Sequence, residues 1–468
     1  MTKIQDITSP MTPSERYATL SLAGIYALRM LGLFMILPVL SLFAKQLEGS
    51  TPALIGLAMS IYGLPQVLLQ IPFGLLSDRF GRKRIIIFGL ILFFIGSVIA
   101  ALSTSIYGVL AGRAFQGAGA ISAAIMALVA DLTQEVHRTK AMATIGISIG
   151  MSFGVGIVAG PVVAGFGGVQ AVFGLTALLT VLAILAIIYL VPNPQQSRRH
   201  RDAEFVPSQM LDALKNTELL RLDYGIFILH MILMAIFVVV PTQMRNAGLS
   251  AGHEWQVYLP VFVISMGFAV PFIILAEKKR KMKQVFIGAI TVLMIAELGL
   301  SQYHQNLFGI IGFLWLFFCG FNLLEATLPS LVSKTAPGDL KGTAMGAYSS
   351  SQFMGLFIGG LVGGWFNGAY GETAVFLFCA GAASSWLLVS LRMKPPRYVA
   401  NMLISLVNLN KQDADQFAAG MLEIIGVEEV TLNFEDAVAY LKVDNQRLET
   451  DRLQALITRY ESVAGESL

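Results

Sequence analysis

The stretch Gly74-Leu-Leu-Ser-Asp-Arg-Phe-Gly-Arg-Lys-Arg84 joins two apolar segments of the chain, residues 53–77 and 84–103. It places a single carboxylate, Asp78, beside four basic side chains within seven residues. Each flanking segment can cross the hydrocarbon core of a bilayer, because a membrane-spanning helix needs about 20 apolar residues. Short loops rich in Lys and Arg are typical of the cytoplasmic ends of such helices. The stretch therefore predicts a polytopic membrane protein.

The composition of the whole chain agrees with this prediction. Of 468 residues, 55% are hydrophobic and 13% are charged, whereas a soluble domain carries about 25% charged residues. The mean hydropathy is +0.70. The pattern predicts an all-α polytopic membrane protein with twelve transmembrane helices, at approximately 17–44, 53–77, 84–103, 106–131, 141–166, 168–191, 221–245, 255–276, 284–302, 306–332, 342–366 and 373–392.

The distribution of Lys and Arg between the loops predicts the orientation of these helices. The loops on one side contain only Lys45 and Arg245 as basic residues. The loops on the other side contain Arg79, Arg82, Lys83, Arg84, Arg138, Lys140, Arg198, Arg199, Arg201, Lys215, Arg221, Lys278, Lys279, Arg280, Lys281, Lys283, Lys334 and Lys341. Basic loops remain in the cytoplasm, so both termini are expected there.

The chain divides into four parts. Residues 1–191 and 221–394 are each expected to form a six-helix bundle, and residues 192–220 form a cytoplasmic linker with a short surface helix from Val206 to Arg221. Residues 395–468 are expected to form a small soluble α+β domain. Its pattern predicts the order βαββα, which is ferredoxin-like. The predicted elements are strands Tyr398 to Val407, Val427 to Phe434 and Ala437 to Val443, and helices Asp413 to Ile425 and Thr450 to Tyr460.

The two halves of the membrane part are similar to each other. Segment 71–84 (IPFGLLSDRFGRKR) aligns with segment 270–283 (VPFIILAEKKRKMK), so that Asp78 matches Glu277. Further matches follow in order, with an offset that changes only from 199 to 203 residues. The later matches pair Gly156, Gly160, Gly165 and Gly168 with Gly359, Gly363, Gly368 and Gly371. An ordered series of this kind predicts two six-helix repeats, as in many secondary transporters.

Three motifs resemble those of the major facilitator superfamily. Segment 74–84 resembles its loop between the second and third helices, and Leu110, Arg113, Gln116, Gly117 and Gly119 resemble its fourth-helix pattern. Segment 156–165 (GIVAGPVVAG) resembles the fifth-helix pattern of the drug/proton antiporter branch, although Ala164 stands where a second glycine is usual. The added C-terminal domain resembles that of YajR-type transporters, a group from the bacterial inner membrane.

The resemblance implies alternating access by two rocking halves, coupled to protons and directed outward. It also implies a multi-pass protein of the bacterial inner membrane that works as a monomer on a small organic substrate, with protons and lipid as its other partners. We expect no nucleic-acid partner. Two alternatives remain open: a membrane sensor whose C-terminal domain reads a cytosolic ligand, and a proton-coupled uptake symporter.

The loop motif predicts a conformational latch, by which we mean charge pairs that break and reform as helices slide. Its residues are Gly74, Asp78, Arg79, Gly81, Arg82 and Asp131. Asp131 is the expected partner of Arg82, and family analogy places Asp78 near the start of the eleventh helix at Gly342 and Thr343. In the alternative interpretation, the basic residues only hold the loop in the cytoplasm. Likewise Gly156, Gly160, Pro161 and Gly165 suit either close helix packing or an antiport-specific role.

Five ionisable side chains fall inside predicted spans, where a charge is costly and usually faces a cavity. They are Arg29, Arg113, His230, Glu297 and Glu325. A carboxyl group in a low-dielectric cavity takes up protons more readily than one in water, so Glu325 is the candidate proton site, with Arg29 and Arg113 setting its field. The alternative for Glu325 is an internal salt bridge or an interhelical hydrogen bond, and the alternative for His230 is a hydrogen bond between helices. Glu297 lies near the expected outer interface, where it could stay hydrated.

Several function classes are not supported by any motif. The chain has no phosphate-binding glycine loop with its lysine, no His, Cys and carboxylate cluster with metal-ligand spacing, and no nucleophile–base pair. Cys319 and Cys379 both fall in apolar stretches. We therefore expect no enzyme activity, no cofactor and no metal.

The C-terminal domain carries the opposite charge to the basic loops. From residue 397 on, the chain has twelve acidic and six basic residues, a net charge of −6. Since the whole chain is +3, residues 1–396 carry +9. Opposite fields joined by a short tether favour contact, so the domain is expected to dock on the basic loops.

Overall fold

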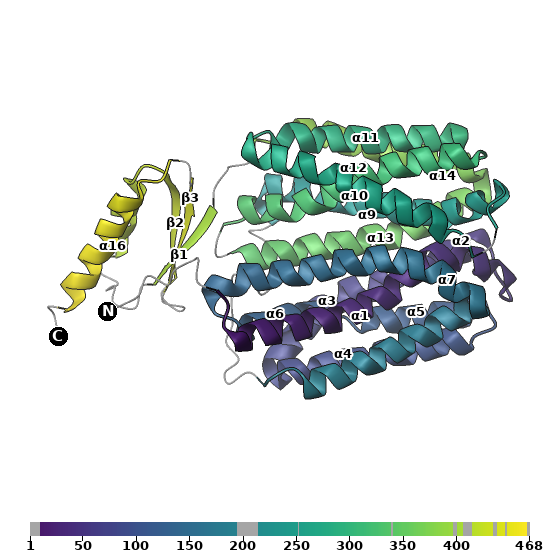
Figure 1. Cartoon of the computed structure of the whole chain (residues 1–468), viewed down its shortest axis with the longest axis horizontal. Helices are drawn as coiled ribbons and strands as arrows, with labels where there is room; N and C mark the ends of the chain where they lie inside the picture. The colour runs from purple at the N-terminus through teal and green to yellow at the C-terminus, as the bar shows by residue number, and fades with distance from the viewer. Residues whose placement is uncertain are drawn as a thin grey trace.

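The protein is a bundle of long helices with a small three-stranded sheet beyond one end, as a computed structural model of the chain shows (Figure 1). The structure describes residues 10–193, 214–250, 252–337, 340–395, 400–405, 414–433, 438–444 and 447–465. The first half of the predicted surface helix of the linker, residues 206–213, therefore lies outside the described residues, as do the ends of the first predicted strand and the turn at Glu435 and Asp436.

The helices form two groups along the chain. The first group consists of α1 (Pro13–Phe43), α2 (Pro52–Ser60), α3 (Gly63–Phe80), α4 (Arg82–Leu102), α5 (Ile106–Ala118), α6 (Ser122–Leu132) and α7 (Glu135–Tyr189). The second consists of α9 (Thr217–Asn246), α10 (Trp255–Lys278), α11 (Met282–Tyr303), α12 (Leu307–Thr335), α13 (Lys341–Tyr370) and α14 (Glu372–Leu391). We call them the first half and the second half.

The helix boundaries follow from local sequence signals. Thr12 and Glu15 form a reciprocal capping box before α1, and Pro13 occupies its first position. Thr51 accepts a hydrogen bond from the Leu54 amide at the start of α2. Gly81 separates α3 from α4 with φ +97°, a conformation that favours glycine because a Cβ atom is strained there. This requirement explains the glycine inside the loop motif.

The described helices differ from the predicted spans at three places. The second and fourth predicted spans are each interrupted, between α2 and α3 and between α5 and α6. The fifth and sixth are joined in α7, although Gly167 and Gly168 depart from helical φ and ψ. Ten described segments are long and apolar enough to cross a membrane. The 30-residue α13 is not among them because it is rich in Gly and Ser, so the count of twelve stays a prediction.

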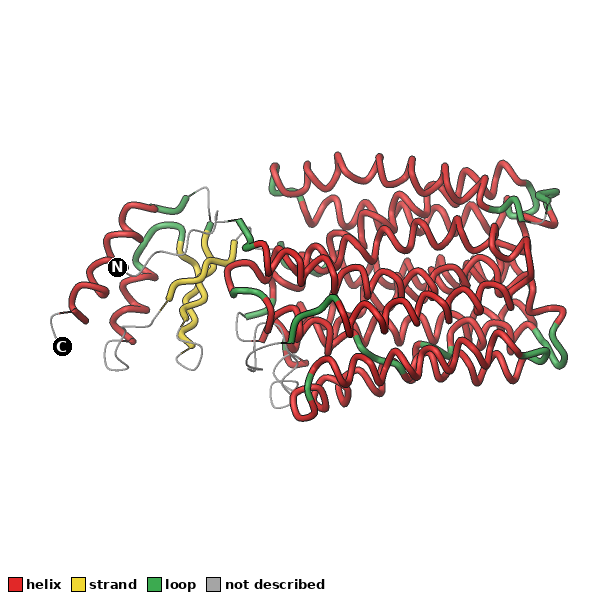
Figure 2. Tube along the Cα trace, turned by 60° about the horizontal axis from the view of Figure 1, so that its bottom comes forward, coloured by secondary structure: helices red, strands yellow, loops and turns green. Residues whose placement is uncertain are grey.

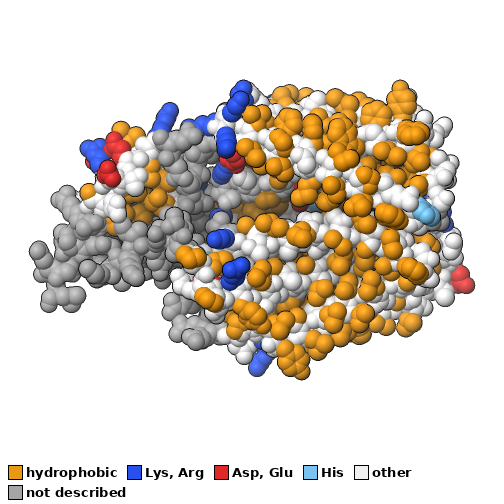
Figure 3. Space-filling model, in the orientation of Figure 1, with side chains coloured by type: hydrophobic (Ala, Val, Ile, Leu, Met, Phe, Trp, Pro, Cys, Tyr) orange, Lys and Arg blue, Asp and Glu red, His pale blue; other side chains and the backbone are white. Residues whose placement is uncertain are grey.

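The outer surface suits a lipid environment. On the face shown in Figure 3, apolar side chains cover the bundle along its length, and Lys and Arg gather at the end nearest the sheet. Large apolar residues such as Phe166 on α7 and Leu102 on α4 are exposed. In water an apolar surface of this extent would be unfavourable, whereas in a bilayer it contacts lipid tails. The chain is therefore a membrane protein with mostly helical spans.

The two halves are closed on each other at the end remote from the sheet. One apolar cluster continues across both halves and includes Met35 and Ile55 of the first half and Ile232 and Phe237 of the second. A second cluster consists mainly of first-half residues and also includes Phe353 of α13. In the closed region α2 packs directly on α13, and a Cβ atom added to Gly56 would meet the backbone of Gly360 and Gly364.

The C-terminal part follows the predicted order of elements. β1 (Ala400–Ser405), α15 (Ala414–Leu422), β2 (Val427–Asn433), β3 (Val438–Val443) and α16 (Thr450–Gly465) succeed one another. The sheet has the order β1-β3-β2, with β3 antiparallel to both neighbours. The strands lie between the bundle and the two C-terminal helices (Figure 2). Phe417, Met421, Leu441 and Val443 form part of a separate apolar core.

The C-terminal part contacts the basic end of the bundle. Arg280, in the loop between α10 and α11, donates to Asp444 over 2.6 Å. Lys442 donates to the Ala336 carbonyl oxygen after α12 over 2.9 Å. The first of these contacts joins an acid of the domain to one of the predicted basic loops, in agreement with the expected docking.

Replacing Gly56 by Ala tests the close contact between the halves. We expect the added methyl group to collide with α13 and to cost about 1–3 kcal/mol, the usual penalty of overpacking, which would lower the midpoint of thermal unfolding of the purified protein. The matched control is Gly24→Ala on α1, where nothing lies within 4 Å of the added atom. There the better helix propensity of Ala should leave the midpoint unchanged or raise it. Equal behaviour of the two variants would contradict the contact.

Candidate functional site

The loop motif forms a compact charge cluster at the end of the bundle near the sheet. Arg82, at the start of α4, contacts Asp78 of α3 and donates from Nε to Asp131 of α6 over 3.2 Å. It also donates to the Ser77 hydroxyl over 2.8 Å. The side chains of Arg82 and Asp131 are buried, and that of Asp78 is 21% exposed. The guanidinium group therefore bridges three helices of the first half through charge-assisted hydrogen bonds.

Two other motif residues have different surroundings. Gly74 lies against Ala123 of α6, so that a larger residue would push the two helices apart. Arg79 is exposed, and its guanidinium group lies 5.5 Å from the centre of the Phe80 ring. The predicted contact between Asp78 and the start of α13 stays a prediction.

The second half carries a related ion pair. Glu277, which matches Asp78 in the repeat, accepts from Lys334 of α12 over 2.6 Å. Lys334 occupies the position that matches Asp131, since the offset there is 203 residues. In the first half, α3 and α6 each supply an acid, and Arg82 of α4 links the two. In the second half, the corresponding helices α10 and α12 are joined directly by an acid and a base.

Arg113 satisfies the backbone at the interruption between α2 and α3. Its three donor nitrogens reach the carbonyl oxygens of Ala58 and Met59 and the side chain of Gln116, over 3.3, 2.9 and 2.9 Å. A helix interrupted inside a membrane leaves carbonyl groups that water cannot reach, and neighbouring side chains must satisfy them. Arg113 is completely enclosed. Its hydrogen bonds therefore join α5 to the carbonyl groups at the end of α2.

Arg29 has a similar position at the interruption between α5 and α6. Its Nη2 atom donates to the Gly119 carbonyl oxygen over 2.9 Å, to Gln66 over 3.1 Å and to the Tyr62 hydroxyl over 3.2 Å. Within the described part of the chain, Nε and Nη1 have no hydrogen-bond partner. Among the same residues, no hydrogen bond or ion pair joins Arg29 or Arg113 to Glu325. The predicted electrostatic effect of the arginines on Glu325 is therefore not supported by a direct contact.

The structure brings Glu325 and His230 together. His230 of α9 lies 3.8 Å from a Glu325 oxygen on α12. The Gln352 amide of α13 donates to His230 Nε2 over 2.8 Å, and His230 Nδ1 contacts the Ile226 carbonyl oxygen over 3.3 Å. With Nε2 accepting and Nδ1 donating, the ring is neutral. The Glu325 oxygen nearest His230, Oε2, has no hydrogen-bond partner among the described residues, so this carboxyl group is available to a proton or a ligand.

Glu297 does not lie where the sequence suggested. Hydration was one of the two interpretations of Glu297, and its exposed fraction of 0% argues against it; a role in the proton pathway stays a prediction. The residue is on α11, which packs against α12 and α14 rather than against the first half. Within the described residues, neither carboxylate oxygen has a hydrogen-bond partner. The hydropathy pattern could not reveal this burial, because the packing of α14 over α11 is a tertiary contact.

The glycines of α7 lie against α1. A Cβ atom on Gly156 would meet Phe34 and the Met35 amide, and one on Gly160 would meet the Met35 backbone. In the second half, Gly359 and Gly363 of α13 lie in the same way against Met231 and Ala235 of α9.

The remaining motif positions on α7 have other surroundings. Pro161 is buried inside the helix, and nothing lies within 4 Å of the position that a Gly165 Cβ atom would take. Close packing therefore accounts for Gly156 and Gly160 but not for Gly165.

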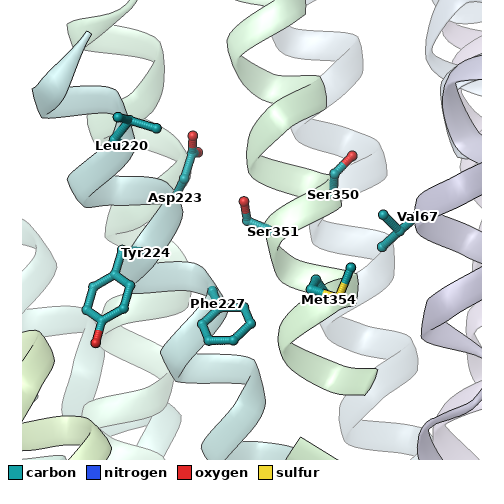
Figure 4. A pocket seen from close by; sticks show the side chains of 8 residues that line it. All are labelled: Val67, Leu220, Asp223, Tyr224, Phe227, Ser350, Ser351 and Met354. Atoms are coloured by element: carbon teal, nitrogen blue, oxygen red, sulfur yellow. The ribbon is translucent and has the colours of Figure 1, made fainter. Parts of the chain in front are cut away.

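A cavity of 390 Å³ lies between the two halves (Figure 4). Val67 of α3 lines it from the first half, and α9 and α13 line it from the second. Its acidic residue, Asp223, is buried and projects from α9 beside Ser351 of α13. Sequence reasoning missed Asp223 because it falls two residues inside the predicted span 221–245, where a charge is easily assigned to the helix end.

Two similar helical halves around an interfacial cavity, with a charge cluster between α3 and α4, are features of secondary transporters. A family model described as Major Facilitator Superfamily matches residues 22–360. The chain belongs to the major facilitator superfamily. Since its members move solutes across membranes, the chain is a transporter and not an enzyme.

Relatives agree with this assignment. The chain is 47% identical over 437 residues to the inner membrane transport protein YajR of Escherichia coli K12, covering 93% of this chain and 96% of YajR. It is 25% identical over 372 residues to the quinolone resistance protein NorA of Staphylococcus aureus, covering 74% and 89%. Among solved structures, a bacterial homologue of the human lysosomal transporter Spinster superimposes with TM-score 0.67 at 15% identity, covering 82% and 98%.

The role of Arg113 in this facilitator fold can be tested by Arg113→Lys. A lysine keeps the charge but reaches one acceptor where Arg113 reaches three, and each buried carbonyl left unsatisfied costs about 1–3 kcal/mol. We expect a lower midpoint of thermal unfolding. Arg16→Lys, at an exposed position of α1, should leave the midpoint unchanged. A stable Arg113→Lys protein would mean that the interruption of α2 and α3 does not depend on the guanidinium group.

Proposed function

We propose that the protein is a proton-coupled exporter of small organic compounds that works by alternating access in the bacterial inner membrane. In this proposal it acts as a monomer with twelve spans and both termini in the cytoplasm. Residues 1–191 and 221–394 are the two rocking bundles, 192–220 the linker and 395–468 a ferredoxin-like domain. The split arrangement of β1, β3 and β2 supports the last assignment.

The observation that carries the proposal is the free carboxyl group of Glu325 beside His230. It lies on α12 near the Gln352 side chain of α13, and α13 also lines the cavity between the halves. A carboxyl group without a fixed partner can exchange a proton with the cavity without breaking a salt bridge, and the neutral imidazole beside it offers a second acceptor. Similarity to the quinolone resistance protein NorA supports export as the direction.

The packing of the halves supports alternating access. Their glycine contacts close the end remote from the sheet, and the cavity lies nearer the sheet. Opening of the closed end must separate α2 from α13 and bring the basic ends of the halves together. The Arg82 cluster would then meet the start of α13, where the positive end of the helix dipole favours the carboxylate of Asp78.

Glu325→Gln tests proton coupling, since the substitution removes the titrating group and keeps its shape. In proteoliposomes we expect the variant to lose substrate-dependent proton flux and to retain substrate exchange down a substrate gradient. Glu48→Gln, an exposed carboxylate between α1 and α2, is the matched control and should transport normally. If pH-dependent flux persists in Glu325→Gln, the proton site must be reassigned among Asp131, His230 and Glu297.

Asp78→Asn tests the latch. Loss of this charge removes one partner of Arg82 and should shift the balance between the two conformations. We expect a transport rate at least about tenfold lower, which corresponds to about 1.4 kcal/mol, with normal membrane insertion and elution volume. Asp415→Asn on the exposed face of α15 should leave the rate unchanged. Transport at the wild-type rate by Asp78→Asn would refute the latch.

The contact of the C-terminal part with the bundle favours a second role, the sensing of a cytosolic ligand. Arg280 and Asp444 join the sheet to the loop between α10 and α11, so a ligand that displaced the domain would change the constraint on these helices. This role is compatible with transport and would appear as an altered rate in Asp444→Asn.

A further inference from the structure

Asp223 is a buried acidic residue that belongs neither to the candidate proton site nor to the charge cluster around Arg82. Its residue exposure is 8%, and its Oδ1 atom has no hydrogen-bond partner among the described residues. The nearest base along α9, Arg221, contacts Glu218 and donates to the Arg392 carbonyl oxygen over 3.0 Å. A buried carboxylate without a partner is costly, and Asp223 lines the cavity between the halves.

The rest of the cavity lining suits a ligand with one polar end. Of the eight described residues that line it, Asp223 alone has a carboxyl group. Ser350 and Ser351 add hydroxyl groups from α13, and the Ser350 oxygen is buried without a partner within the described chain. Phe227, Met354 and Val67 supply apolar surface. A cavity of 390 Å³ falls in the range of small-molecule sites, about 300–1,000 Å³.

We propose that this cavity binds an organic cation, with its ammonium group on Asp223 and its apolar body against Phe227 and Met354. This inference rests on the proposed function, because it names the substrate class of the exporter. An ammonium group supplies the donors that Asp223 and the two serines can accept, and pairs with the charge. An organic anion would meet an uncompensated carboxylate, and a neutral compound would leave that carboxylate unpaired.

The position of the site suits transport. Val67 comes from the first half and Asp223 from the second, so a ligand held here contacts both halves at the surface where they move apart. Ser351 of α13 lines the cavity, and the next residue, Gln352, donates to His230 of the candidate proton site over 2.8 Å. The cation site and the candidate proton site therefore involve neighbouring residues of α13.

Binding of three compounds that differ only in head group tests the inference. The compounds are 3-phenylpropylamine, 3-phenylpropan-1-ol and 3-phenylpropanoate, which are cationic, neutral and anionic at pH 7. Their affinities for the purified full-length protein in nanodiscs of zwitterionic lipid can be measured by ligand-observed NMR, with empty nanodiscs as the blank. We expect the amine to bind about tenfold or more tightly than the alcohol, the size expected of a charge-assisted hydrogen bond, and the carboxylate to bind most weakly.

Three variants separate recognition by Asp223 from a structural role. Asp223→Asn should remove the preference for the amine and leave the affinity for the alcohol unchanged, whereas Asp223→Glu should retain the preference. Glu48→Gln should behave as the wild type. Equal affinities of the wild type for amine and alcohol, or an equal loss of both in Asp223→Asn, would overturn the inference. If Asp223→Asn does not fold, equal binding of amine and alcohol by Asp223→Glu and the wild type would overturn it as well.

The experiment is independent of proton coupling, because it measures binding at equilibrium without a pH gradient. An amine preference that depends on Asp223, in a protein that shows no proton-driven flux, would leave the site standing and refute the exporter. Proton-driven flux, in a protein that binds amine and alcohol equally well, would support the exporter and refute the cation site.

Discussion

Every backbone carbonyl group inside a bilayer must find its hydrogen bond within the protein, and the interior of the first half is arranged around this constraint. The second and fourth predicted spans are interrupted, and each interruption lies beside an arginine. Arg113 donates to the carbonyl groups at the end of α2, and Arg29 donates to Gly119 after α5. The two arginines, which a hydropathy profile suggests as functional residues, therefore donate hydrogen bonds to backbone carbonyl groups.

Close approach of helices is the second constraint, and glycine meets it. Gly156 and Gly160 of α7 lie against the backbone of α1, and Gly359 and Gly363 of α13 lie against α9. Without a hydrophobic drive between helices in lipid, association depends on van der Waals contact between closely spaced backbones. Gly56 uses the same device between the halves, where it meets α13. Contacts inside a half and between halves thus have the same chemistry, and only the latter must separate during transport.

Charge is concentrated at two levels of the bundle. At the end near the sheet, ion pairs around Arg82 and Lys334 tie helices together within each half. Elsewhere in the bundle, Glu325 lies 3.8 Å from a His230 ring that its hydrogen bonds make neutral, and Asp223 has no ion-pair partner among the described residues. A paired charge resists change, because breaking it leaves a buried ion, whereas an unpaired carboxyl group can accept a proton or a cation without that cost. The difference in pairing distinguishes groups that hold the structure from groups that can bind.

The sequence by itself determined the membrane setting, the two similar halves, the cluster of Asp78, Arg82 and Asp131 and the order of the C-terminal elements. These features depend on local composition, on spacing along one or two helices, or on a motif. They can therefore be predicted from the sequence without knowledge of tertiary contacts. It also selected Arg29, Arg113 and His230, which are buried, and Glu325, which is partly exposed, because a charge in an apolar segment is visible without a structure.

Only the tertiary structure decided what these groups do. Glu325 and His230 are 95 positions apart in the sequence and meet because α9 packs against α12. Glu297 is enclosed rather than hydrated because α14 covers α11, and Asp223 became a candidate because α3 and α13 close a cavity around it. The partners of a buried charge come from helices that are distant in the sequence, and its energy depends on those partners more than on its own span.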